Sequence, residues 1–494
     1  MLNSTTILPA YLCMLLFLGA CNSNPQTEQP HSNESDDPPN IIYILADDMG
    51  YGDLSSYGQK VLSTPNIDRL ATEGIKFTQH YAGATVCAPS RASLLTGKQP
   101  GRSSVRGNKP DGQLLSDDEV TLPEALKPQG YASAIIGKWG VGHPPPPDDP
   151  LRNGFDHAYG YINMWHAHNF YPEFLYRNGE KVTLPGNNTD RSHPYPANMP
   201  EGTGVAQEKG TYVLYEFEKD ALDFIEEKKD QPFFLYLALN MPHANNEAGY
   251  YLKDGMEVPG YGQFEDKEWP NPEKGFARMI EMIDETVGKV MAKVAELGLD
   301  DNTLIVFASD NGPHEEGGHK ADFFNSNGEL RGTKRDLYEG GIRVPMIARW
   351  PGKIPGGTSS NHMCAFWDVL PTFCDIAGTE TPEGIDGISF LPSLLGDNDE
   401  QKVHDYLYWE FYELGGRQAV REGDWKYVKL NVRDPESPLV KELYNLKSDL
   451  GETQNVMDQH PEIVEKLEGR MQEAHQPHPL IKLFSSESNA ETKF

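Results

Sequence analysis

Four short apolar runs constrain the fold more than any other feature of the sequence. They occupy residues 41–46, 132–137, 232–239 and 303–309. Continuous apolar runs of this length predict buried strands that are covered on both faces. Helical patterns lie among them at 64–74, 120–127, 212–228 and 275–298. Strands that alternate with helices predict an α/β fold, with a large doubly wound mixed sheet flanked by helices.

The sequence changes character after residue 396. Short, aromatic-rich segments at 406–412, 417–421, 425–430 and 442–446 are separated by Gly, Asp or Pro. Such segments predict an antiparallel sheet, and a helical pattern follows near 461–474. We therefore expect a large domain at 40–396 and a smaller C-terminal α+β subdomain at 397–494.

The N-terminal residues predict export. The apolar run at 7–20 is too short to span a bilayer and is typical of a signal peptide covering residues 1–20. It ends in Leu-Gly-Ala-Cys21, which resembles a bacterial lipobox, so Cys21 is the expected lipidation site. Residues 21–39 are polar and rich in Ser, Asn and Pro, as in a disordered tether. We expect a lipoprotein of the periplasm, outer membrane or cell surface that contacts the membrane only through its lipid; ordinary secretion is the alternative.

The charge of the chain limits its partners. The 494 residues carry a formal net charge of −31. This excludes nucleic acid, whose recognition needs a basic face. An anionic substrate is repelled at long range, so its binding requires cations concentrated at the site.

The cysteines leave one pairing open. Cys364 and Cys374 flank an apolar, helix-like run. They are either joined by a disulfide or are two buried free thiols.

Oxygen donors follow two of the predicted strands. Asp47 and Asp48 come directly after the strand at 41–46, and Asp310 and Asn311 follow the strand at 303–309. Adjacent carboxylates at the end of a buried strand are costly unless a cation neutralises them. In an open α/β sheet, ligands gather beyond the carboxyl ends of the strands. Three carboxylates and an amide suit Ca²⁺ ahead of Mg²⁺, and suit zinc poorly.

Cys87 is expected at the start of a helix. Pro89 in the first turn and Gly97 beyond the apolar pair at 94–95 indicate the two ends of that helix. The N-terminus of a helix favours an anion or a developing oxyanion. Arg91 lies one turn further along, on the same face. The plain alternative is a buried cysteine beside a capping serine, Ser90.

The segment Cys87-Ala-Pro-Ser-Arg91, followed by Leu-Leu-Thr-Gly97, resembles the sulfatase signature. The similarity is to type I, formylglycine-dependent sulfatases of the alkaline phosphatase superfamily, and within them to bacterial arylsulfatase A-like carbohydrate sulfatases. It covers about residues 40–450. It implies that a formylglycine-generating enzyme oxidises Cys87 to formylglycine, an aldehyde whose hydrate, a geminal diol, is the catalytic nucleophile. It also implies one Ca²⁺ per chain, bound by Asp47, Asp48, Asp310, Asn311 and residue 87.

The resemblance further implies catalytic side chains at three other places. Lys138, at the end of the strand at 132–137, and Lys334, in the segment 330–345, match sulfate-binding lysines. His243 follows the strand at 232–239 and matches a sulfate-binding histidine. It is a credible general acid for the leaving alcohol, because imidazole titrates near neutral pH. Arg91 is expected to favour the alkoxide of the nucleophile.

Position 140 departs from the family pattern. The family has a histidine there that helps to eliminate sulfate from the formylglycine, whereas this chain has Gly140. His143, His166 and His168 are the candidates to take its place, and the sequence does not choose among them.

The resemblance implies hydrolysis of sulfate esters by S–O cleavage on a carbohydrate. We expect a sulfated galactose or N-acetylgalactosamine of a polysaccharide or its oligosaccharides, with the 4-sulfate as the specific expectation. The expected substrate contacts are His166, His168, Asn245, His314 and Arg335. Two alternatives remain: a phosphomonoester or phosphonate hydrolase of the same superfamily, and a non-catalytic surface lipoprotein that binds sulfated glycans.

Overall fold

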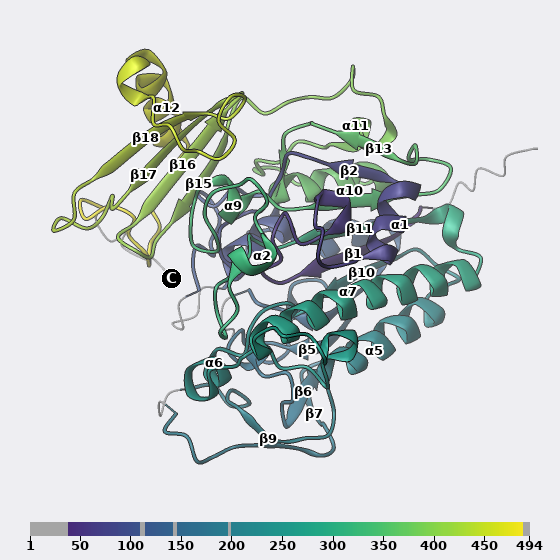
Figure 1. Ribbon diagram of the computed structural model, residues 1–494. Coiled ribbons are helices and arrows are strands. Elements are labelled where there is room, and N and C mark those ends of the chain that lie inside the picture. The colour runs from purple at the N-terminus through teal and green to yellow at the C-terminus, as the bar shows by residue number, and fades with distance from the viewer. Residues whose placement is uncertain (1–37, 109–113, 142–145, 196–198, 488–494) are drawn as a thin grey trace, which may run out of the picture. The chain divides into compact units, whose positions relative to one another are not determined.

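A ten-stranded sheet forms the centre of the computed structural model (Figure 1). The structure describes residues 38–108, 114–141, 146–195 and 199–487. The strand order is β13-β2-β12-β11-β1-β10-β4-β5-β6-β7. The bounds are β1 Asn40–Ala46, β2 Ile75–Phe77, β4 Ala132–Lys138, β5 His157–Tyr161, β6 Phe174–Arg177, β7 Glu180–Thr183, β10 Phe233–Ala238, β11 Thr303–Ser309, β12 Met346–Arg349 and β13 Thr358–Ser360.

The five central strands, β11, β1, β10, β4 and β5, run parallel. The carboxyl ends of these strands are aligned: Ala46 pairs with Ser309, and Ala238 pairs with Leu45 on one side and Gly137 on the other. The residues that follow each strand therefore emerge at one edge of the sheet. The four predicted apolar runs are β1, β4, β10 and β11, which confirms the α/β expectation.

Helices cover both faces of this sheet. Along β1, Ile42 and Ile44 face one helical layer, while Ile41 and Tyr43 face the other, as the two-residue period of a strand requires. The first layer contains α1 (Pro65–Glu73), α5 (Val213–Glu227) and α7 (Asn271–Glu296). The second contains α2 (Cys87–Thr96), α3 (Leu122–Leu126) and α10 (Val369–Ala377).

A separate four-stranded antiparallel sheet lies in the C-terminal part, as expected. Its strands are β15 (Leu407–Phe411), β16 (Arg417–Glu422), β17 (Trp425–Leu430) and β18 (Val440–Asn445). The helix α12 (Pro461–Ala474) packs on one face through Leu467 and Met471. The other face packs Trp409 and Val428 against Tyr81. The described residues belong to one compact unit, and the boundary at 396/397 stays a prediction.

Shorter elements complete the fold. The strand β3 (His80–Tyr81) pairs with β14 (Cys364–Ala365), and β8 (Asn187–Thr189) pairs with β9 (Ala206–Lys209). The short helices are α4 (Asp149–Arg152), α6 (Asn246–Leu252), α8 (Ala321–Phe324), α9 (Glu339–Ile342) and α11 (Leu391–Leu395). Cys364 and Cys374 are both buried free thiols, so the disulfide alternative is wrong.

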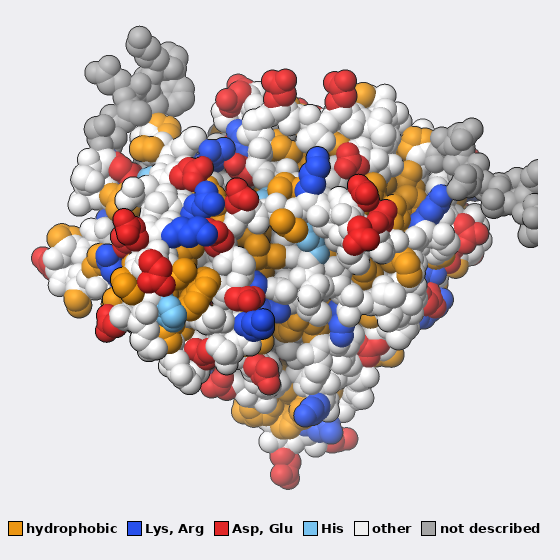
Figure 2. Space-filling model, turned by 90° about the horizontal axis from the view of Figure 1, so that it is seen from above, with side chains coloured by type: hydrophobic (Ala, Val, Ile, Leu, Met, Phe, Trp, Pro, Cys, Tyr) orange, Lys and Arg blue, Asp and Glu red, His pale blue; other side chains and the backbone are white. Residues whose placement is uncertain are grey.

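The exposed surface agrees with the acidic composition. On the face shown in Figure 2, acidic side chains are interspersed with Lys and Arg, without an extended basic patch. Within the described ranges, no helix combines the length and apolar character needed to cross a membrane. The predicted signal peptide and Cys21 lie outside the described residues, as does nearly all of the predicted tether.

Candidate active site

The ends of β1 and β11 bring four oxygen-bearing side chains together. Asp47 and Asp48 leave β1 beside Asp310 and Asn311, which leave β11, and all four are fully buried. The Asp48 backbone N–H donates to Asp310 Oδ1 over 3.0 Å, and Asn311 Nδ2 donates to Asp48 Oδ1 over 2.7 Å. The predicted grouping of these residues therefore exists in the fold.

Cys87 is the first residue of α2 and lies against this acidic group. Its Sγ is 3.4 Å from Asp47 Oδ1. Gly97 ends the helix in the left-handed conformation, as the sequence indicated. Burial, followed by the charge of Asp47, raises the pKa of the Cys87 thiol. A thiol held in this way stays protonated and is a poor nucleophile.

Three cations neutralise the carboxylates. Lys138 Nζ lies 2.6 Å from Asp47 Oδ2, and Lys334 Nζ lies 2.8 Å from Asp48 Oδ2. Arg91 Nη2 is 2.9 Å from Asp310 Oδ2, and Arg91 also donates to the Lys138 carbonyl.

The cations decide which carboxylates are charged. Burial alone raises the pKa of a carboxyl, but the attraction of Lys138, foremost among several cations, holds the pKa of Asp47 well below its usual range. Burial prevails at Asp310, where it and the charge of Asp47 raise the pKa to about 7.

His243 follows β10 and contacts Lys334. Its Nδ1 lies 2.7 Å from the Ala244 carbonyl, and its Nε2 lies 3.0 Å from Lys334 Nζ. A lysine ammonium only donates and a carbonyl only accepts, so the ring carries its proton on Nδ1 and accepts at Nε2. Burial, and then Lys334, lower the pKa of His243 to about 3.

The donor set fits a hard divalent cation. Ligand atoms of Asp47, Asp48, Cys87 and His243 lie within 4.8 Å of one another. The buried Asn311 Oδ1 has no hydrogen-bond partner in the described part of the chain, so an acceptor is left for a cation. Carboxylate and amide oxygens suit Ca²⁺, whereas a thiol does not.

A small cavity of about 180 Å³ opens onto these side chains. Six of the predicted site residues line it: Cys87, Lys138, His168, His243, Lys334 and Arg335. Six further lining residues were not among the individually predicted site residues: Val86, Asn108, Met164, Trp165, Asn246 and Glu413. Glu316 was not among them either. It lies 3.2 Å from Lys334 Nζ and 2.6 Å from Arg335 Nη1.

Three predicted substrate contacts are not among the residues that line the cavity, and their contact with substrate stays a prediction. His166 is buried between Tyr161 and Phe174. Asn245 caps α6 by accepting from the Ala248 N–H, and its Nδ2 donates to Gly204 and Glu257. His314 is buried, and its ring nitrogens contact the Pro242 carbonyl and the Glu316 N–H. The polar side-chain atoms of Asn245 and His314 are used in hydrogen bonds within the fold. His166 Nε2 has no hydrogen-bond partner in the described part of the chain. His143 lies outside the described residues.

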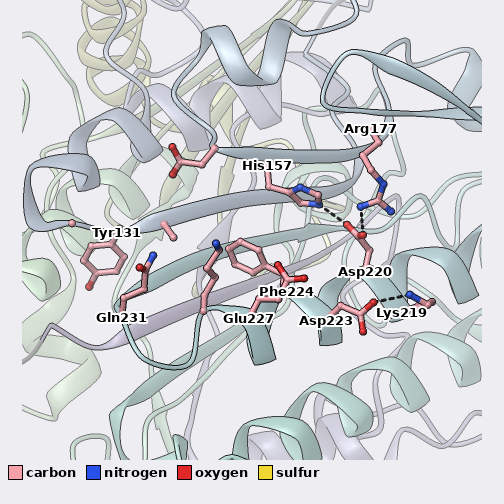
Figure 3. Close-up of a pocket in the computed structure, with 13 residues that line it drawn as sticks. Tyr131, His157, Arg177, Lys219, Asp220, Asp223, Phe224, Glu227 and Gln231 are labelled. Atoms are coloured by element: carbon pink, nitrogen blue, oxygen red, sulfur yellow. Dashed lines mark hydrogen bonds and ion pairs between the residues drawn. The ribbon is translucent and has the colours of Figure 1, made fainter.

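A larger cavity, of about 680 Å³, lies at the other edge of the sheet (Figure 3). Ala132 and His157, the first residues of β4 and β5, line it. Five of its titratable groups pair with one another: Asp220 contacts both His157 and Arg177, and Lys219 contacts Asp223. Because these five groups are already paired and the cavity lies away from the carboxyl ends of the strands, the smaller cavity is the candidate site.

Comparisons with known proteins show what the chain is similar to. The family model described as Sulfatase matches residues 39–379, and the model described as N-sulphoglucosamine sulphohydrolase, C-terminal, matches residues 331–477. An N-acetylgalactosamine-6-sulfatase from Canis lupus familiaris is 35% identical, over 73% of this chain and 66% of its own length. The chain therefore spans about two thirds of that relative.

Two further matches extend over more of the chain. An N-acetylgalactosamine-6-O-sulfatase from Bacteroides thetaiotaomicron is 29% identical, over 94% of this chain and 98% of its own length. The solved structure of Ps i-CgsB in complex with k-i-k-neocarrahexaose has a TM-score of 0.70 at 26% identity, and the match covers 91% of this chain and 96% of that one.

Proposed function

The chain belongs to the sulfatase family of sulfuric ester hydrolases, and from this premise we propose that it hydrolyses sulfate esters on a galactose or N-acetylgalactosamine carbohydrate. The observation that carries the proposal is the convergence of Cys87, Lys138, His243 and Lys334 on one small cavity. Family membership favours this function over a phosphohydrolase and over a non-catalytic glycan binder.

We propose that Cys87 is converted to formylglycine by a formylglycine-generating enzyme. As a thiol, residue 87 is protonated by burial and offers sulfur to a site built of oxygen ligands. Water adds to the aldehyde to give a geminal diol; one hydroxyl oxygen suits both nucleophilic attack on sulfur and a calcium site, and the second allows sulfate to be expelled as the aldehyde re-forms. Asp47, Asp48, Asp310, Asn311 and that oxygen would hold Ca²⁺, which would supply positive charge for the sulfate oxygens.

The side chains of the cavity have distinct proposed roles. Lys138 and Lys334 orient the sulfate and offset its charge as the S–O bond to the sugar breaks. Arg91 holds Asp310 and the end of β4 in place and favours the nucleophile's alkoxide. When sulfate binds, the Lys334 ammonium turns toward it and no longer donates to His243 Nε2. The negative charge of the bound sulfate also raises the pKa of His243. His243 then holds a proton at Nε2 and gives it to the leaving oxygen.

We propose that His168 takes the role of the family histidine that is absent at position 140. Gly140 has φ +65, and a Cβ there would lie 3.0 Å from Arg91 Cδ and 3.2 Å from Lys138 Cε. A histidine at this position would therefore have a strained backbone and would crowd both side chains. His168 lines the cavity instead, and its Nδ1 lies 3.3 Å from Glu247 Oε2. A carboxylate at Nδ1 keeps that nitrogen protonated and leaves Nε2 as a base.

The names of the relatives favour the 6-sulfate of the sugar over the 4-sulfate that the sequence suggested. Arg335, Trp165 and Asn246 line the cavity and are the proposed sugar contacts. Export, with a lipid on Cys21, stays part of the proposal. The mass of the mature N-terminal peptide tests it.

The test is desulfation by protein co-expressed with a formylglycine-generating enzyme. The panel contains the 4- and 6-sulfates of galactose and N-acetylgalactosamine, their oligosaccharides and a phosphomonoester. We expect sulfate release from at least one sugar, fastest for a 6-sulfate, and none from the Cys87→Ala variant. Release of phosphate alone would overturn the proposal.

A further inference from the structure

The C-terminal sheet contributes one acidic side chain, Glu413, to the active cavity. Glu413 lies in the turn between β15 and β16 and lines the cavity beside Lys334 and Arg335. The next residues, Leu414, Gly415 and Gly416, all have left-handed backbones, with φ of 50°, 82° and 80°.

The turn is held in this conformation by its neighbours. The Gly415 and Gly416 carbonyls accept from the Arg433 N–H over 2.8 Å and the Val432 N–H over 3.0 Å. The sheet therefore fixes the position of Glu413.

The same sheet holds the neighbouring Arg335. Arg417, the first residue of β16, donates to the Arg335 carbonyl over 2.9 Å. Arg335 has a left-handed backbone, with φ of 78°, and its guanidinium is committed to Glu316. Glu413 and Arg335 thus form one fixed wall of the cavity.

Glu413 differs from the other charged groups around the cavity. Lys138, Lys334 and Arg335 each contact a carboxylate, namely Asp47, Asp48 and Glu316 respectively. The backbone carbonyl of Glu413 accepts from the Gly416 N–H over 3.0 Å, whereas its carboxylate makes no hydrogen bond or ion pair with the part of the chain that the structure describes. It is a carboxylate with free acceptor positions, next to a site built for an anion.

We propose that Glu413 is a specificity-determining residue. It accepts a hydrogen bond from a hydroxyl or amide N–H of the sugar that carries the sulfate, and it repels sugars that carry a second sulfate or a carboxylate beside it. This inference rests on the proposed function and narrows its substrate class to singly sulfated sugars with neutral neighbouring groups.

The size of the cavity and the chemistry of a carboxylate support this role. A volume of about 180 Å³ equals roughly six water molecules in the liquid, so the sulfate and the sugar groups next to it fill the cavity and come close to Glu413. An ionised carboxylate accepts but does not donate, so it selects hydroxyl and N–H donors. Like charges brought together in a partly buried site repel strongly.

Binding to catalytically inactive protein tests the inference without turnover. In the Cys87→Ala background, calorimetry at one fixed salt concentration gives Kd for galactose 4-sulfate, galactose 6-sulfate and galactose 4,6-disulfate. We expect the parent to bind one monosulfate more tightly than the disulfate. Glu413→Gln should weaken monosulfate binding and lower the ratio of disulfate Kd to monosulfate Kd by about tenfold or more.

Two matched variants separate specificity from folding. Glu413→Asp keeps the charge and should retain the discrimination. Glu436→Gln removes an exposed carboxylate from the β17–β18 connection and should retain the parental ratio. An unchanged ratio in Glu413→Gln, or equal binding of monosulfate and disulfate by the parent, would overturn the inference. If matured enzyme releases no sulfate while Glu413→Gln still shifts the ratio, only the proposed function fails.

Discussion

His168 and His243 lie face to face at the active cavity, with ring centroids 4.9 Å apart and planes inclined by 13°. They come from different parts of the chain, His168 from the β5–β6 connection and His243 from the residues after β10. Each has a different partner, Glu247 for His168 and Lys334 for His243. The pair can therefore divide acid and base chemistry between two rings.

The first prediction concerns His168. His168→Ala should release the sugar alcohol once per active site and then stop, because the base that frees sulfate from residue 87 is missing. Steady-state turnover should fall by about 100-fold or more, and the residue-87 peptide should carry a sulfuryl group in mass spectra. Glu247→Gln should give a smaller loss. Steady-state turnover at the wild-type rate in His168→Ala would contradict the assignment.

The second prediction concerns calcium and stability. Calcium bound only by the folded protein should raise the free energy of unfolding by about 2.7 kcal/mol at a free concentration about 100 times its Kd. Urea unfolding with calcium and with a chelator measures this difference. Asn311→Ala should reduce this difference, since Asn311 Oδ1 is a buried acceptor without a hydrogen-bond partner among the described residues, whereas Asn398→Ala, at an exposed position, should not. Equal stability of the wild type in both buffers would argue against the metal site.

The third prediction concerns Asp53, where burial raises the pKa to about 7. Below about pH 4 the carboxyl is protonated in both the folded and unfolded chains. Between about pH 4 and 7 only the folded chain keeps the proton, so the stabilisation that this carboxyl contributes falls as pH rises, by roughly 4 kcal/mol in all. Above pH 7 the contribution is constant.

Asp53→Asn should remove this fall. Urea unfolding of the wild type and the variant at a series of pH values gives the difference in the free energy of unfolding. If the difference in the free energy of unfolding between wild type and variant stays constant from pH 4 to 7, the pKa of Asp53 is not raised in the folded protein.

The sequence predicted the sheet core and the centre of the site because both depend on local patterns. The runs at 41–46 and 303–309 indicate buried strands, and strand register then brings Asp48 and Asp310 together. The start of α2 at Cys87 follows from Pro89 and Gly97. In these cases, the residues that indicate the strand or helix lie next to the functional residues in the sequence.

The walls of the cavity could not be predicted in this way. His166 and His168 lie two residues apart in one short 3₁₀ segment, and tertiary packing decides that only His168 faces the cavity. Asn245 and Asn246 differ by one position, yet the first caps α6 while the second lines the cavity. Glu413 belongs to a turn with no motif. Only the packing of the antiparallel sheet brings it to Cys87.

The most direct test of the central claim is the mass of the residue-87 peptide, read together with sulfate release by the same preparation. Protein co-expressed with a formylglycine-generating enzyme should show the aldehyde at residue 87, and sulfate release should rise in proportion to the aldehyde fraction. An intact Cys87 thiol in fully active protein would contradict the account.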